Sequence, residues 1–179
     1  MRILLHICCA NCAIYPVKVL RENNWDVSGC FFNHNIHPYQ EFKRRLDSLK
    51  DYAEQVKLNI TYQEEYQLEE FLANVAHDPH NRCDYCYQSR LTTTARLAAE
   101  QGFDAFSTSL LYSRYQQHDK IRDIGEALAR KFNLQFVYQD FRKGWNDGIK
   151  TSKEMNLYRQ QYCGCIYSEK DRYYPRSRN

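Results

Sequence analysis

The chain has 179 residues, of which 43% are hydrophobic, 26% charged and 15% aromatic, and it contains only six Gly and four Pro. This composition is typical of one compact globular domain, here residues 1–179, and excludes collagen, disordered chains and tandem domains. A chain of this length buries roughly 70% of the surface that its unfolded form exposes, so its core needs no disulfide or metal. The formal net charge of +3 is too small to identify a partner.

The apolar run at residues 3–7 is interrupted by His6 and follows a single basic residue. Neither a secretory signal nor a membrane span fits this pattern. We therefore expect a cytoplasmic protein without a membrane partner. In that reducing compartment, eight cysteines indicate metal binding or redox chemistry rather than a disulfide framework.

Short apolar segments alternate with amphipathic ones along the chain. Strands are expected at residues 2–8, 27–32, 59–63, 105–108 and 134–138, and helices at residues 14–23, 38–56, 68–76, 86–101 and 119–132. The helix at 38–56 has the clearest apolar stripe, with Arg45 among the charged residues on its other faces. The alternation predicts an α/β fold with a doubly wound, mostly parallel five-stranded sheet and flanking helices. Ligands bind such sheets at the carboxyl ends of the strands, where the strand order reverses.

Seven of the eight cysteines fall into three groups, which are Cys8, Cys9 and Cys12, then Cys83 and Cys86, then Cys163 and Cys165. The C-x-x-C pair enters an expected helix, whose N-terminus favours thiolates. Four thiolates suit either zinc or an iron-sulfur cluster. Because neighbouring side chains on a strand diverge, Cys8 and Cys9 are expected to suit a cluster better than one ion. We therefore favour a [4Fe-4S] cluster on Cys8, Cys9, Cys83 and Cys86, with zinc as the alternative.

The remaining cysteines have separate interpretations. Cys163 and Cys165 enclose one glycine, so a disulfide between them closes a small, strained and readily reduced ring. This spacing favours a redox-active dithiol, with free thiols or two further metal ligands as alternatives. Cys12 either binds a second metal ion or lines the pocket. Cys30, inside an expected strand, is interpreted as a small buried side chain.

An ordered set of motifs covers residues 2–168. It includes His6-Ile7-Cys8-Cys9-Ala10-Asn11-Cys12, Asn33-His34-Asn35-Ile36-His37-Pro38, Cys83-Asp84-Tyr85-Cys86-Tyr87 and Tyr162-Cys163-Gly164-Cys165. This set resembles the cobalamin-independent epoxyqueuosine reductases of the QueH type. Asn11 departs from the resemblance, since Pro is common there.

The resemblance implies the last step of queuosine synthesis, in which the epoxide of epoxyqueuosine at the wobble position of tRNA is reduced to the alkene of queuosine. It implies a fold similar to the adenine-nucleotide alpha-hydrolase (HUP) group, and we expect a helical, cysteine-bearing C-terminal segment. It also implies that Cys8, Cys9, Cys83 and Cys86 hold the cluster and that Cys163 and Cys165 form the redox pair. A second metal ion, iron, would lie near Cys12.

Reduction of an epoxide to an alkene consumes two electrons and two protons. We name Asp84 as the candidate proton donor, with a helix-capping role as the alternative. His6, Tyr85, His37 and Asp140 are further candidates by position. The electron donor is not identified by the sequence.

The C-terminal residues are basic and aromatic, which makes RNA a candidate partner, with a solvated tail at residues 171–179 as the alternative. The side chains concerned are Lys170, Arg172, Tyr173, Tyr174, Arg176 and Arg178. A zinc-stabilised RNA-binding module without catalysis is the main rival function. A cluster-dependent tRNA thiolase is the second rival, but the sequence has no phosphate-binding loop after the first strand, so we expect no use of ATP.

Overall fold

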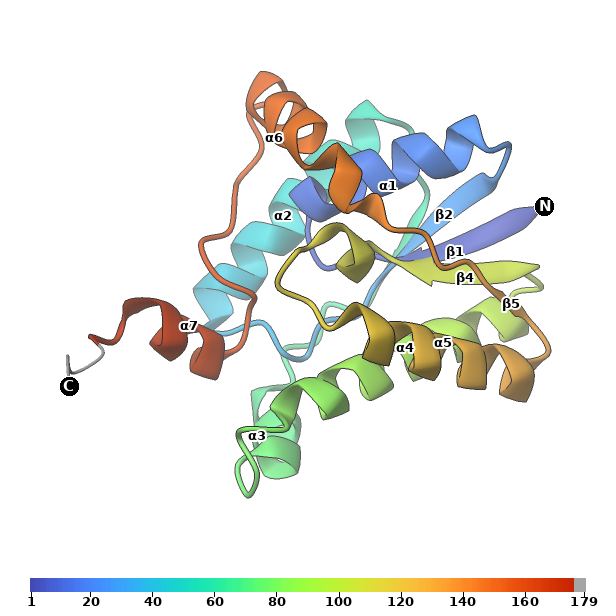
Figure 1. The fold of residues 1–179 in the computed structure, drawn as a ribbon. Coiled ribbons are helices and arrows are strands. Elements are labelled where there is room, and N and C mark those ends of the chain that lie inside the picture. The colour runs from blue at the N-terminus through green and yellow to red at the C-terminus, as the bar shows by residue number, and fades with distance from the viewer. Residues whose placement is uncertain (176–179) are drawn as a thin grey trace.

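Five parallel strands form one sheet in the computed structural model, which describes residues 1–175 (Figure 1). The strands are β1 (Arg2–His6), β2 (Asp26–Phe31), β3 (Ile60–Tyr62), β4 (Ala105–Thr108) and β5 (Gln135–Phe136). They lie in the order β3-β2-β1-β4-β5, and each neighbouring pair is parallel. The expected doubly wound α/β fold is therefore confirmed, and the strand order reverses between β1 and β4.

Helices cover both faces of this sheet. They are α1 (Ala10–Glu22), α2 (Tyr39–Gln55), α3 (Leu68–Val75), α4 (Arg82–Glu100), α5 (His118–Phe132), α6 (Trp145–Glu154) and α7 (Ile166–Tyr173), with 3-10 turns η1 (Ser109–Tyr112) and η2 (Phe141–Gly144). Helices α1, α2 and α6 lie on one side of the sheet and α4 and α5 on the other, while α7 lies beyond the carboxyl ends of the strands (Figure 1). Among residues 1–175, none of the helices has the length and apolar content that a membrane crossing requires.

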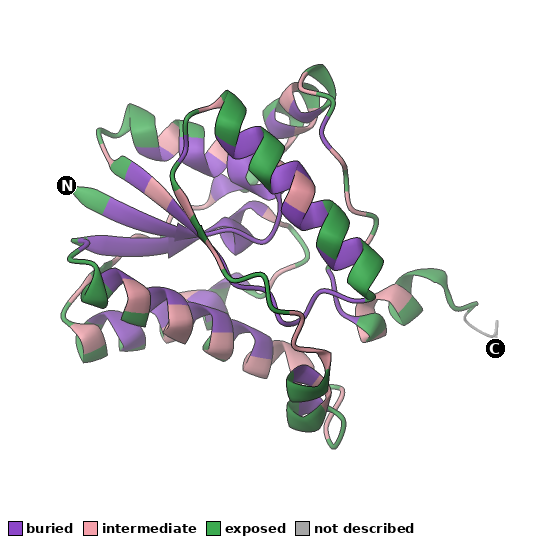
Figure 2. Cartoon of the chain, turned by 180° about the vertical axis from the view of Figure 1, so that it is seen from behind, coloured by how far each residue is buried: buried purple, intermediate pink, exposed green. Residues whose placement is uncertain are grey.

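The central strands are buried on both faces, as Figure 2 shows in purple. Ile3, Leu5 and Phe106 are completely enclosed. Each such side chain stabilises the fold by roughly 1.5–3 kcal/mol relative to exposure in water. Since helices cover both sides, these strands are continuous apolar runs rather than alternating ones, which made them recognisable in the sequence.

Three of the boundaries that differ from expectation change the local structure of cysteines, because they move Cys12 into α1, Cys8 out of β1 and Cys83 into α4. Pro16 favours a helix start close to it, but α1 already begins at Ala10 and holds Pro16 in its interior. Strand β1 ends at His6, so Cys8 lies in the turn between β1 and α1 rather than in a strand. Helix α4 begins at Arg82, so the whole C-x-x-C motif lies within the helix, with Cys83 in its first turn and Cys86 just after that turn.

Candidate metal and thiol site

The turn after β1 brings three thiols together at the point where the strand order reverses. The sulfur atoms of Cys8, Cys9 and Cys12 all lie within 4.8 Å of one another, and those of Cys8 and Cys9 are 3.8 Å apart. The expectation that the first two diverge is wrong, because they lie in a turn and Cys9 is the residue that precedes α1. Tetrahedral coordination with metal–sulfur bonds of about 2.3 Å places sulfurs about 3.8 Å apart, so this spacing also suits a single ion.

Hydrogen bonds distribute the negative charge within this group. The hydroxyl of Ser109, just after β4, accepts from the backbone N–H of Cys8 at 3.2 Å and donates to its sulfur at 3.5 Å. Hydrogen bonds from Cys12 and Cys9 hold the pKa of Cys8 well below its usual range. Burial raises the pKa of Cys9, and donation to Cys8 raises that of Cys12. The first charge therefore resides on Cys8, and a cation would favour loss of the other two protons.

A second group of thiols forms where α4 and α7 meet. Cys83 and Cys86 are three residues apart in α4, so they lie on one side of the helix. Cys86 shares a small apolar cluster with Cys165, and Arg82 ties α4 to α7 through a 2.5 Å ion pair with Asp171. Burial raises the pKa of Cys86 to about 12, although the nearby Arg90 lowers it.

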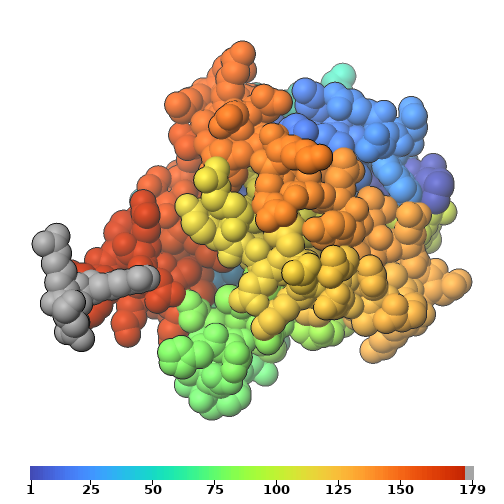
Figure 3. Space-filling view, in the orientation of Figure 1, coloured from blue at the N-terminus to red at the C-terminus, as the bar shows by residue number. Residues whose placement is uncertain are grey.

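Residues 157–165, here named the strap, lead from α6 to α7 and carry Cys163 and Cys165. The backbone N–H of His37 donates to the oxygen of Gly164 at 2.9 Å, and the hydroxyl of Tyr162 donates to the backbone oxygen of His37. In Figure 3 the strap and α7, in red, meet the yellow segment that follows η1. The strap is thus fixed to the loop after β2, and Cys163 is exposed while Cys165 is buried.

Arg90 of α4 is the buried cation between the two thiol groups. It is 2% exposed, and its Nε donates to the backbone oxygen of Cys86 at 3.0 Å. Within residues 1–175 it has no carboxylate partner. Burial opposes its charge, but the thiolates of Cys86, Cys163 and Cys8 raise its pKa. Because an unpaired buried charge is costly, Arg90 fits a site in which nearby sulfurs are anionic, as they are when they bind metal.

Asp84, the predicted proton donor, lies at the edge of this region. Its carboxylate accepts from Nζ of Lys120 at 2.6 Å, and its side chain is 49% exposed. It lines an open hollow between α4 and α5 with Tyr85. The residue preceding α4 is Asn81, and Asp84 belongs to the first turn, so it does not cap this helix.

Two other candidate proton donors have their polar atoms engaged elsewhere. Nε2 of His6 donates to the backbone oxygen of Phe32 at 3.3 Å, and Nδ1 accepts from the hydroxyl of Thr108 at 3.0 Å. Burial lowers the pKa of His6 to about 4, so its ring is neutral. Asp140 accepts two side-chain hydrogen bonds from Arg142, which lower its pKa to about 2. Arg142 is therefore paired with a carboxylate.

Several polar residues of the site had no signal in the sequence. Arg45 was expected on a charged outer face of its helix, but it is 1% exposed because it pairs with Glu41 and contacts the strap. Two glutamines donate to thiols, Gln116 to Cys163 and Gln160 to Cys12, each at 3.3 Å. The only sequence pattern that connects Glu41 with Arg45 is their spacing of four residues. This spacing also occurs in ion pairs on the exposed faces of helices, so it does not indicate burial.

Comparison with known proteins places the chain in a family. The sequence profile of the family "Epoxyqueuosine reductase QueH" matches residues 3–171. The chain belongs to this family. The motif resemblance is thereby confirmed, and the chain is an enzyme of the oxidoreductase class.

Two curated relatives carry the same description. The chain is 38% identical to epoxyqueuosine reductase QueH of Dehalococcoides mccartyi over 172 residues, covering 96% of this chain and 94% of the relative. It is 32% identical to the Thermotoga maritima protein of that name over 176 residues, covering 93% and 89%. Among solved structures, a predicted tRNA methyltransferase subunit from Methanocaldococcus jannaschii is similar with a TM-score of 0.53 and 12% identity, covering 85% of this chain and 75% of that one. That likeness supports the fold alone.

Proposed function

We propose that this enzyme reduces the epoxide of epoxyqueuosine in tRNA to the alkene of queuosine. Family membership supports the reaction. The main structural support for the proposed active site is the position of Cys163 and Cys165. They lie close to the C-x-x-C pair and to Arg90, at the carboxyl edge of the sheet. This is the edge at which doubly wound proteins bind their ligands.

The dithiol of Cys163 and Cys165 can balance this reaction by itself. Oxidation of two thiols to one disulfide releases two electrons and two protons. Reduction of one epoxide to one alkene consumes both electrons and both protons and releases one water molecule. Each turnover thus leaves Cys163 and Cys165 as a disulfide, which an external electron donor must reduce before the next. The exposed Cys163 is accessible both to substrate and to that donor.

The metal centre is proposed as a [4Fe-4S] cluster on Cys8, Cys9, Cys83 and Cys86, with Cys12 available to a second metal ion, iron. Three of these four thiols are buried and Cys83 is half-buried, and the nearby cation of Arg90, which has no carboxylate partner among the described residues, supports an anionic centre here. When bound, such a cluster would supply single-electron transfer, and the second metal ion, which has open coordination positions, would supply Lewis-acid polarisation of the epoxide oxygen. Arg90 compensates the negative charge of the thiolates.

Asp84 remains the proposed proton donor. It follows Cys83 directly, and its half-exposed carboxylate is accessible to a bound nucleotide. To transfer a proton it would have to exchange its contact with Lys120 for one with the substrate. Replacement by Asn should then slow turnover without changing metal content.

The tRNA would be bound beside the strap. Helix α7 and the following residue expose Lys170, Arg172, Tyr173 and Tyr174, which can contact phosphates and stack on unpaired bases. Arg176 and Arg178 lie outside the described residues. Family membership supports tRNA as the substrate, and the proposed reaction consumes no ATP.

A zinc centre is the alternative to the cluster, favoured by the close spacing of the Cys8, Cys9 and Cys12 sulfurs. Measurement of iron, zinc and acid-labile sulfide on anaerobically purified protein separates the two. A [4Fe-4S] cluster requires about four iron and four sulfide per chain, and iron beyond the sulfide would indicate the second metal ion. Zinc without sulfide would contradict the proposed cluster. Because family membership shows an enzyme, the non-catalytic zinc-stabilised RNA-binding module considered from the sequence is not proposed.

Activity is tested by single-turnover conversion of epoxyqueuosine in tRNA under anaerobic conditions. Cys163→Ser should abolish conversion while metal and sulfide contents stay at the wild-type level. Cys30→Ser is the control for loss of a cysteine outside the three groups, because Cys30 is buried in β2, and it should convert normally. If Cys163→Ser loses the cluster as well, Cys163 is a ligand and the redox assignment is wrong.

A further inference from the structure

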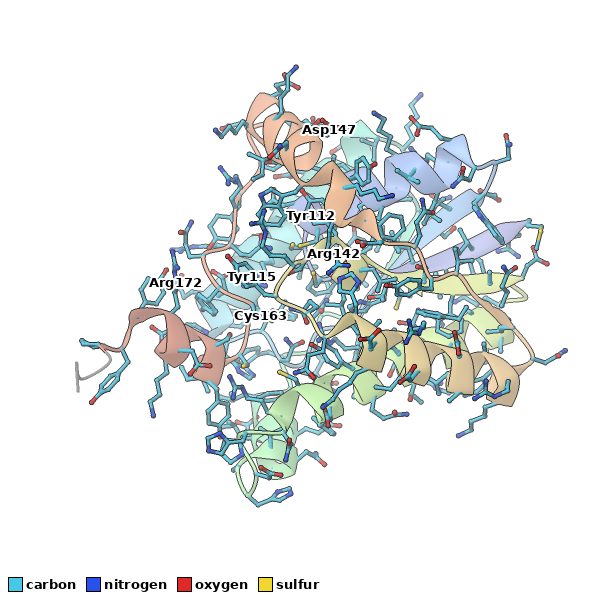
Figure 4. The ribbon with its side chains drawn as sticks, in the orientation of Figure 1. Tyr112, Tyr115, Arg142, Asp147, Cys163 and Arg172 are labelled. Atoms are coloured by element: carbon cyan, nitrogen blue, oxygen red, sulfur yellow. The ribbon has the colours of Figure 1, made fainter. Side chains whose placement is uncertain are left out.

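We infer that Gln116 positions the sulfur of Cys163, which is the accessible and therefore the reactive thiol of the pair. Nε2 of Gln116 donates to this sulfur at 3.3 Å. Gln116 belongs to the segment between η1 and α5, and Cys163 belongs to the strap. Figure 4 shows the exposed Tyr115 of that segment directly across from Cys163.

A relay of hydrogen bonds sets the direction of the Gln116 amide. The backbone N–H of Gln117 donates to the hydroxyl oxygen of Tyr87 at 3.2 Å, so the hydroxyl hydrogen remains free. That hydrogen is donated to Oε1 of Gln116 at 2.9 Å. Because its oxygen is engaged, the amide must present its NH₂ group to Cys163. Tyr87 is 2% exposed and lies within α4, so the relay starts from a rigid position.

The two sulfurs of the pair have different surroundings. Cys165 is buried, and its sulfur accepts the backbone N–H of Ser168 at 3.4 Å, at the start of α7. Cys163 is exposed and has the side-chain donor Gln116. The guanidinium of Arg82 and the start of α7 lie at Cys165, so charge does not favour Cys163 over Cys165. Access selects Cys163 as the sulfur that meets substrate or an external reductant, and Gln116 holds that sulfur in place.

This inference rests on the proposed redox role of Cys163. It can nevertheless be measured without substrate, by the rate at which iodoacetamide alkylates Cys163 in the full-length, anaerobically purified protein at pH 7. Peptide mass spectrometry distinguishes this cysteine from the others. Gln116→Leu removes the donor, and Gln116→Glu replaces it with an oxygen that repels a thiolate.

We expect Gln116→Leu to slow alkylation roughly threefold, because the attacking sulfur loses the hydrogen-bond donor that orients it. Gln116→Glu should slow it further, because a carboxylate oxygen repels the attacking sulfur. Tyr87→Phe should act in the same direction with a smaller effect. Gln117→Leu is the matched control, because it keeps the backbone N–H that contacts Tyr87, and it should react like the wild type.

Each outcome decides one assignment. If Cys163 of both Gln116 variants is alkylated as fast as Cys163 of the wild type, the inference about Gln116 is wrong. The redox role of Cys163 is not affected by that result. If Cys163 is protected until a chelator removes metal, it is a ligand, and the redox role and this inference are both wrong. A thermal melt of each variant checks the fold, and equal slowing of all cysteines would mark a structural effect that also contradicts the inference.

Discussion

Arg45 of α2 and Cys163 of the strap are joined by a 2.8 Å hydrogen bond from Nη1 to the backbone oxygen, across 118 positions of sequence. Nη2 of the same guanidinium donates to the oxygen of Tyr162 at 3.0 Å, and Nε donates to Glu41 at 2.7 Å. The second oxygen of Glu41 accepts from the hydroxyl of Tyr158 at 2.6 Å. One buried ion pair in α2 therefore holds both ends of the strap.

Arg45→Met should destabilise the protein by about 3–5 kcal/mol, because it leaves the buried carboxylate of Glu41 and two strap carbonyls without their donor. Urea unfolding measures this change. Lys43→Met is the matched control, since Lys43 forms an exposed pair of the same spacing with Asp47 on the same helix and should cost less than about 1 kcal/mol. Equal effects of the two substitutions would show that Arg45 does not hold the strap.

The sheet could be predicted because its information is local. Residues 105–108 are a continuous apolar and small-residue run, and the stripe of Phe42, Leu46 and Leu49 has the period of a helix. Each segment thus carried its own pattern, and their alternation identified the topology. Helix α6 was missed because its buried residues are few, Gly148 and Ser152 among them, so it has no apolar stripe.

The cysteines could be grouped from the sequence, but their surroundings could not. Gln116 and Gln160 are distant in sequence from the thiols that they contact, and a glutamine in a loop carries no pattern. The orientation of Cys8 and Cys9 depended on where β1 ends, and a shift of two residues changed it. These contacts depend on how the chain folds in three dimensions and leave no periodic pattern in the sequence. They could therefore not be predicted without the structure.

Arg90→Met tests two effects of the buried cation, which are its unfavourable effect on the stability of the metal-free protein and its favourable effect on metal affinity. After chelation of metal, this variant should be as stable as the wild type or more so, because the guanidinium has no carboxylate to leave unpaired in the described part of the chain. Metal affinity, measured by competition with a chelator, should fall about 10-fold or more, as it does when outer groups of metal sites are removed. Arg96→Met, at an exposed pair in the same helix, should change neither quantity. Unchanged metal affinity in Arg90→Met would contradict the role of Arg90 as counter-charge.

His34 makes stability depend on pH. Both ring nitrogens are buried without a partner among the described residues, and burial, followed by the charge of Arg90, lowers the pKa of the imidazole to about 3. The folded protein therefore keeps His34 neutral, whereas the unfolded chain protonates it below pH 6.5. Above pH 6.5 His34 is neutral in both states, so it makes the free energy of unfolding no lower. As the pH falls from 6.5 toward 3, only the unfolded chain binds the proton, and the free energy of unfolding decreases.

From pH 7 to pH 5, this one histidine should lower the free energy of unfolding by about 2 kcal/mol. His34→Leu should reduce the pH dependence by that amount, as measured by urea unfolding at both pH values. His77→Leu, at an exposed position after α3, should leave the pH dependence as it is in the wild type. An undiminished difference between the two pH values in His34→Leu would mean that His34 is protonated in the folded protein.

Helix α7 should bind RNA through its exposed cations. Lys170→Glu combined with Arg172→Glu reverses two charges beside the strap, so tRNA affinity should fall and the dependence of log affinity on log salt should become shallower by about one to two units. Titration of tRNA between about 50 and 200 mM salt measures both quantities. Lys18→Glu is the control, because Lys18 is 59% exposed on α1, where it pairs with Glu22, and its substitution should leave the salt slope unchanged. If Lys18→Glu loses as much tRNA affinity as the α7 double variant, net charge rather than the surface of α7 determines binding. If the dependence of log affinity on log salt is unchanged in the α7 variant, this helix does not contact the RNA.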